Sequence, residues 1–106
     1  MALDDLSHYR LTPAAQKDLE GIWLYSAQTW SAEQANRYAD ILEEAFGRLL
    51  AMPEIARERA EFDPPVRILP SARHLIVYRI ENDHLVVLRV LGGKQDWQTV
   101  LGVIDR

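Results

Sequence analysis

Residues 74–91 read His-Leu-Ile-Val-Tyr-Arg-Ile-Glu-Asn-Asp-His-Leu-Val-Val-Leu-Arg-Val-Leu, and this stretch decides the fold. Branched and aromatic side chains, which favour β-strands, fill residues 74–81 and 84–91. The Asn82-Asp83 pair between them is typical of a tight hairpin turn. The stretch therefore predicts two long antiparallel strands.

Both faces of this predicted hairpin carry apolar side chains. Strict alternation along the strands gives one face with Ile76, Tyr78, Ile80, Val86, Leu88 and Val90. The other face has Leu75, Val77, Arg79, Leu85, Val87, Arg89 and Leu91. A half-exposed antiparallel sheet normally alternates apolar and polar residues. One helical layer covers only one face, so we expect something else to cover part of the second.

Two helices are predicted upstream of the strands. Thr12-Pro13 supplies an N-cap residue followed by a proline, and helical spacing of apolar residues continues to about Gln28. A capping box at Ser31–Gln34 starts a second helix, which Pro53 ends. Because so few residues join the two helices, they must form an antiparallel hairpin.

The remaining segments are short. Residues 9–11 and 66–69 are further strand candidates, residues 54–65 form a charged loop with room for one helical turn, and residues 97–104 suit a last strand or a docked segment. Residues 1–8 look like a loose leader. We therefore predict a single α+β domain over residues 1–106. It has an N-terminal strand and an antiparallel helical hairpin packed on one face of a small, mainly antiparallel sheet.

Composition excludes several function classes. Among 106 residues, 48% are hydrophobic and 26% charged, as in ordinary globular domains, and there is no cysteine for a disulfide, a thiol nucleophile or an iron–sulfur cluster. The net charge of −4 is concentrated in residues 1–63, which hold twelve acidic against six basic residues. Such a balance is unlike that of a general nucleic-acid binder. Without a signal sequence or a membrane-length apolar stretch, we expect a cytoplasmic protein with no membrane partner.

No general catalytic motif is present. Gly92-Gly93-Lys94 lacks the upstream glycine and the following hydroxyl residue of a phosphate-binding loop. His8, His74 and His84 lie at strand ends or in the leader, without metal-ligand spacing. We therefore expect no catalytic, cofactor-binding or metal-binding residues and no cofactor.

Arg79 and Arg89 stand in the middle of the two predicted strands. Two interpretations are open for them: contact with a carboxylate or phosphate of a partner or substrate, or a structural ion pair. Trp23 and Trp30 are expected to be helix-packing residues.

The chain resembles the ParE toxins of the RelE/ParE superfamily from about Tyr9 to Trp97. The resemblance rests on residues 12–19 with Ile22-Trp23, on Trp30-Ser31, on Pro53, and on residues 74–80 and 87–96. Tyr-Arg on one strand, with Leu-Arg-Val-Leu leading to Gln-Asp on the next, is the most specific part.

This resemblance implies a toxin of a type II toxin–antitoxin (plasmid-stabilisation) module. Such a toxin binds and inhibits DNA gyrase through its A subunit, and a ParD-like antitoxin neutralises it. The toxin is then expected to contact nucleic acid only indirectly, through the antitoxin or the target. The antitoxin, with an acidic amphipathic tail, is expected on the face formed by Leu75, Val77, Arg79, Leu85, Val87, Arg89 and Leu91. The gyrase contact is expected at Arg73, Lys94, Gln95, Asp96 and Trp97.

Two alternatives follow from the same resemblance. RelE-like relatives cut messenger RNA on the ribosome, which requires proton-transfer groups beside the scissile phosphate. Here Gly92 stands where ParE-like sequences often show histidine. We therefore expect a non-enzymatic inhibitor. The other alternative is a non-toxic relative that only holds its antitoxin.

Overall fold

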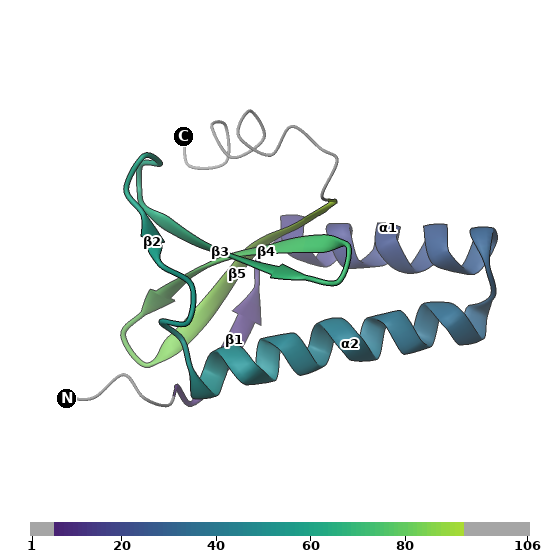
Figure 1. Ribbon diagram of the computed structural model, residues 1–106, viewed down its shortest axis with the longest axis horizontal. Coiled ribbons are helices and arrows are strands. Elements are labelled where there is room, and N and C mark those ends of the chain that lie inside the picture. The colour runs from purple at the N-terminus through teal and green to yellow at the C-terminus, as the bar shows by residue number, and fades with distance from the viewer. Residues whose placement is uncertain (1–5, 93–106) are drawn as a thin grey trace.

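Residues 6–92 are described by a computed structural model of the chain (Figure 1). The elements are β1 (His8–Leu11), α1 (Pro13–Thr29), α2 (Ala32–Ala51), β2 (Glu58–Arg59), β3 (Val66–Ser71), β4 (His74–Glu81) and β5 (His84–Gly92). They form one sheet in the order β1-β5-β4-β3-β2, in which β1 is parallel to β5 and every other pair is antiparallel. The prediction of an α+β fold with a mainly antiparallel sheet is confirmed.

The two helices begin where the capping residues predict. The Thr12 side-chain oxygen accepts a hydrogen bond from the Ala15 amide at 3.1 Å, and the Ser31 hydroxyl accepts one from the Gln34 amide at 3.0 Å. These bonds satisfy amides that a helix N-terminus leaves without partners. The Thr12 hydroxyl also donates to the Leu88 carbonyl at 2.8 Å, so the same residue that starts α1 fixes it to β5.

The assignment of strand residues to faces by strict alternation is wrong. The two-residue turn pairs Glu81 with His84 and Ile80 with Leu85, so even-numbered residues of β4 share a face with odd-numbered residues of β5. A β-bulge between Val77 and Tyr78 then changes this relation further along the hairpin. A bulge puts two residues of one strand opposite one of its partner, and the sequence pattern does not predict it.

Apolar side chains are buried on both sides of the sheet. The cluster on the helical side consists of Leu6, Ala15, Leu42, Ala45, Phe46, Leu49, Ile76, Tyr78, Leu85, Val87 and Val90. The opposite cluster consists of Val66, Ile68, Val77, Val86, Leu88 and Leu91, with Phe62 and Leu75 packed against it. Leu85 and Val87, predicted to share a partner-binding face with Val77 and Leu91, therefore belong to the core beneath the helices.

The N-terminal segment is docked from Leu6 onward. Leu6 is buried, and its amide donates to the Leu50 carbonyl at 2.9 Å, while the Ser7 amide donates to the Asp83 carbonyl at 3.1 Å. The prediction of a loose leader over residues 1–8 is thus wrong for residues 6–8. Residues 1–5 and the predicted tail element at 97–104 lie outside the described residues.

The charged loop after α2 differs from the expectation of a helical turn. Glu58–Arg59 instead pairs with Arg67 and Val66 as the short edge strand β2. Because β2 covers only the start of β3, it leaves the edge beside Pro70 open within residues 6–92. A proline, which has no amide to donate, is therefore accommodated there, and β3 continues past its predicted end to Ser71.

Candidate functional site

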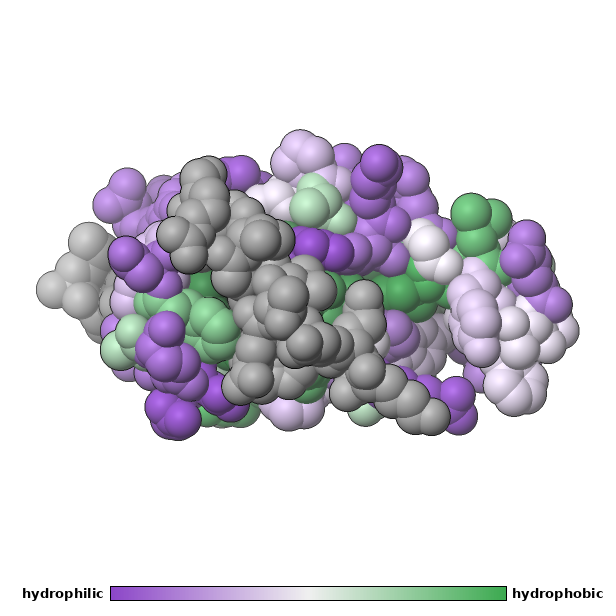
Figure 2. Space-filling view, turned by 90° about the horizontal axis from the view of Figure 1, so that it is seen from above, coloured by the Kyte–Doolittle hydropathy of each residue, from purple (hydrophilic) through white to green (hydrophobic). Residues whose placement is uncertain are grey.

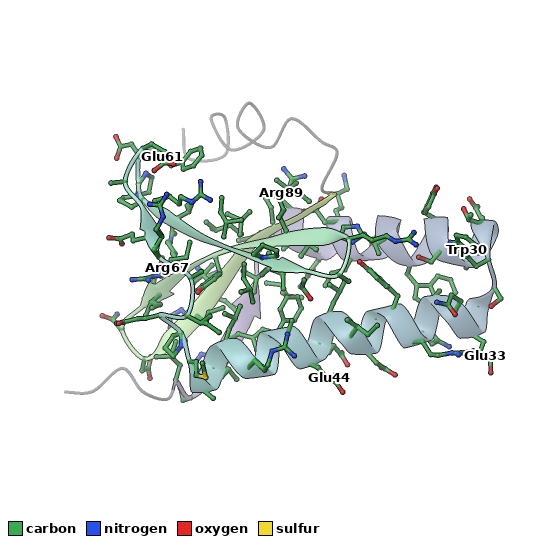
Figure 3. The ribbon with its side chains drawn as sticks, in the orientation of Figure 1. Trp30, Glu33, Glu44, Glu61, Arg67 and Arg89 are labelled. Carbon is green, nitrogen blue, oxygen red and sulfur yellow. The ribbon has the colours of Figure 1, made fainter. Side chains whose placement is uncertain are left out.

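Arg89 is held by an acid of its own chain. Its Nε and Nη2 atoms donate to the two carboxylate oxygens of Asp18 on α1, at 2.7 and 2.9 Å, and the Val90 amide donates to the same carboxylate at 2.9 Å. Only 14% of the Asp18 side chain and 21% of the Arg89 side chain are exposed. The bidentate bond raises the pKa of Arg89 further above its ordinary value. Figure 3 shows Arg89 beside α1. Asp18 thus fastens α1 to β5.

Arg79 also has an intramolecular partner. Its Nε atom donates to Glu81 on the same strand at 2.6 Å, and about a third of each side chain is exposed. Arg79 lines an open groove of about 490 Å³ at one end of the sheet, together with Glu54, Glu58, Pro65, Arg67, Ile80 and Asn82. Both mid-strand arginines therefore form ion pairs within the chain. Contact of either arginine with a partner stays a prediction.

Tyr38 links α2 to the turn between β3 and β4. Its hydroxyl is hydrogen-bonded to Nδ1 of His74 at 2.6 Å and accepts the Arg73 amide at 3.1 Å. Burial lowers the pKa of His74 below its ordinary value, an effect that the Arg73 charge increases and the Asp18 charge opposes. The hydrogen bond to Tyr38 makes His74 a bridge between α2 and β4.

The other two histidines, His8 and His84, stack on each other at the first residues of β1 and β5. His8 and His84 are register partners on β1 and β5, with their rings stacked at 5.0 Å between centroids. Among the described residues, no group of His, Cys, Asp or Glu side chains is arranged to hold a metal ion. The described part of the chain likewise contains no helix long and apolar enough to span a membrane.

An apolar groove of about 270 Å³ lies between α1 and α2, and we call it the helical groove. It is lined by Leu19, Glu20, Ile22, Trp23, Ala35, Ala39, Leu42, Glu43 and Phe46. Trp23 is a packing residue here, as predicted, because its indole Nε1 atom donates to Asn36 of α2 at 2.9 Å. Trp30 is not, since it ends α1 with 62% of its surface exposed (Figure 3).

The predicted binding residues do not form one surface. Val77 and Leu91 are completely buried on one side of the sheet, Leu85 and Val87 on the other, and Leu75 is only partly buried. Of the predicted target-binding residues, Arg73 is exposed at the β3–β4 turn. Lys94, Gln95, Asp96 and Trp97 lie outside the described residues.

Sequence reasoning missed the partners of these groups. Nothing in the sequence around Asp18 indicates that its carboxylate meets β5, because its partners Arg89 and Val90 lie more than 70 residues away along the chain. The Tyr38–His74 bond joins residues 36 apart and has no local signal. The signal in the sequence for the helical groove is a pair of small residues four positions apart on α2, Ala35 and Ala39, which both line it.

The family model that matches this chain and the relatives that resemble it in sequence are described as ParE toxins. A family model described as the ParE toxin of the type II toxin–antitoxin system parDE matches residues 9–97. A relative from Mycobacterium tuberculosis called Toxin ParE1 is 37% identical over 91 residues, which cover 85% of this chain and 93% of the relative. The Toxin ParE1 of Caulobacter vibrioides is 31% identical over 94 residues, covering 89% and 97% of the two chains.

A solved structure described as a chromosomal ParDE toxin–antitoxin system from P. aeruginosa has a similar fold. The TM-score is 0.70 at 20% sequence identity, and the alignment covers 82% of this chain and 95% of that chain. At this identity the likeness concerns the fold alone.

Proposed function

Because the chain belongs to the ParE toxin family of type II toxin–antitoxin systems, we propose that it inhibits DNA gyrase by binding to it in the cytoplasm. In this proposal the chain is not an enzyme, and a ParD-like antitoxin binds it and keeps it inactive. The family match over residues 9–97, which includes every helix and strand of the sheet except the first residue of β1, carries the proposal.

The state of the polar side chains supports inhibition by binding over RNA cleavage. Cleavage at a 2′-hydroxyl requires a general base, a general acid and cations that meet the scissile phosphate. Arg79 and Arg89 are already engaged by Glu81 and Asp18, and His74 is bonded to Tyr38. These groups hold the fold together, which favours a toxin that acts through its surface.

Expression in cells tests the proposal. Production of the chain alone should stop growth and cause filamentation with DNA-damage signalling, because a poisoned gyrase leaves broken DNA. Co-expression of the open reading frame beside its gene, the expected antitoxin, should restore growth. If messenger RNA is cleaved while gyrase activity stays intact, the RelE-type alternative replaces this proposal. If cells grow normally although the chain is soluble and folded, both are contradicted.

A further inference from the structure

Six apolar side chains are buried on the side of the sheet away from the helices. They are Val66, Ile68, Val77, Val86, Leu88 and Leu91, and none of them is more than 8% exposed. Every helical residue in the two core clusters of residues 6–92 belongs to the other cluster. A sheet with one helical layer normally leaves its second face to water and polar side chains. This face therefore has a cover of its own.

The described residues supply only part of this cover. Among residues 6–92, the further apolar side chains packed against the cluster are those of Phe62, in the loop before β3, and Leu75, on β4 itself. A phenylalanine side chain accounts for about 150–250 Å² of buried area. The cluster, in contrast, extends over the three adjacent strands β3, β4 and β5. More of the chain than these two side chains must lie over this face.

The chain leaves the sheet beside the same cluster. β5 ends at Gly92, directly after the buried Leu91, and Gly93 follows in the sequence. Glycine has the backbone freedom that a sharp change of direction requires. The fourteen residues 93–106 reach about 46 Å when extended, whereas the path back along β5 from Leu91 to Val86 measures about 17 Å. This segment is thus long enough to return over the whole cluster.

The sequence of the segment suits an apolar surface. Five of residues 97–104 are large and apolar, and the four charged residues of the segment stand outside this range. Figure 2 looks onto the side of the molecule opposite α2, where apolar surface of the described residues emerges among polar side chains. Burial of apolar surface against apolar surface is the main favourable contribution to folding. The segment and the face therefore complement each other.

We infer that residues 93–106 turn back after β5 and cover the face of the sheet away from the helices, with Trp97 and the apolar residues that follow it packed on Val77 and Leu91. The chain itself then occupies the side of the sheet where Val77 and Leu91 were expected to meet the antitoxin. A partner that binds there must first displace this cover. Trp97 becomes a packing residue and not a contact for gyrase. The inference concerns the chain alone and does not depend on the proposed function.

Fluorescence of Trp97 tests this inference directly. The chain has three tryptophans, so Trp23→Phe combined with Trp30→Phe leaves Trp97 as the only one. In the folded chain without antitoxin, we expect its emission to be blue-shifted from that of the urea-unfolded chain and several-fold less quenched by acrylamide. Circular dichroism establishes that the variant is folded. Emission and quenching equal to those of the unfolded chain would overturn the inference, and protection that disappears on dilution would overturn it in favour of cover by a second copy.

Substitutions within the segment give a second test, which keeps the native tryptophans. Leu101→Ala should raise the equilibrium constant for unfolding of the isolated chain at least about tenfold, because a buried leucine side chain is lost. Gln98→Ala in the same segment is the matched control and should change this constant by less than about twofold. Equal effects of the two substitutions would overturn the inference. If both tests succeed but the chain neither inhibits gyrase nor binds the antitoxin, the proposed function fails and this inference stands.

Discussion

Asp18 shows how one side chain determines the packing of a whole helix. Its carboxylate receives three hydrogen bonds from β5, two from Arg89 and one from the Val90 amide. Charge-assisted bidentate bonds of this kind are among the stronger polar contacts in proteins. The pair is partly shielded from water, so it contributes more than an exposed surface ion pair.

Asp18→Asn should lower the free energy of unfolding by about 2 kcal/mol, because Arg89 loses its charged partner. In a double-mutant cycle with Arg89→Gln, the combined loss should be smaller than the two single losses added together. Urea unfolding measures all four proteins. Glu33→Gln is the control, since its pair with Arg37 is highly exposed and should be worth little. Strict additivity in the cycle would show that Asp18 and Arg89 do not stabilise each other.

His74 predicts a pH dependence of stability. Burial lowers the pKa of His74 in the folded chain below its ordinary 6.5. As the pH falls through about 6.5, the unfolded chain takes up the proton first, so the folded state loses stability. The contribution is complete above the unfolded pKa and is lost as the pH falls toward the folded pKa.

His74→Gln should therefore cost more stability at about pH 8 than at about pH 5, because glutamine does not titrate. Urea unfolding of both proteins at the two pH values measures the difference. A cost for His74→Gln that is the same at both pH values would contradict the pKa shift.

At the scale of elements, the sequence was sufficient wherever the signal is local. The caps at Thr12 and Ser31 and the turn at Asn82-Asp83 predict α1, α2 and the β4–β5 hairpin almost to the residue. The faces of the strands were not predictable, because they depend on a bulge that no side-chain pattern marks. For the same reason, the partner-binding face predicted for β4 and β5 combined residues from two sides of the sheet.

Leu91 is completely buried in the cluster on the side of the sheet away from the helices. Leu91→Ala should therefore destabilise the isolated chain by about 2–5 kcal/mol, the usual cost of removing a buried leucine side chain. Leu24→Ala is the control, since 53% of Leu24 is exposed and its loss should cost less than about 0.5 kcal/mol. Similar stabilities for the two variants, measured by urea unfolding in the absence of antitoxin, would mean that Leu91 is a free binding surface after all.

At the scale of the whole molecule, the polar groups that looked available for chemistry stabilise the fold. Arg89 joins α1 to β5, the Tyr38–His74 bond joins α2 to the sheet, and the His8–His84 stack joins β1 to β5. The described residues also form two open grooves, one at the end of the sheet beside Arg79 and an apolar one between the two helices. This arrangement is compatible with the proposal that the chain acts by binding other proteins.

Titration of purified DNA gyrase with the purified chain, read as supercoiling of relaxed plasmid, tests this account most directly. We expect supercoiling to fall as the amount of chain becomes comparable to that of gyrase. Longer incubation should not deepen the inhibition, as enzymatic turnover would, and antitoxin added beforehand should prevent it. Undiminished supercoiling at a large excess of folded chain would contradict it.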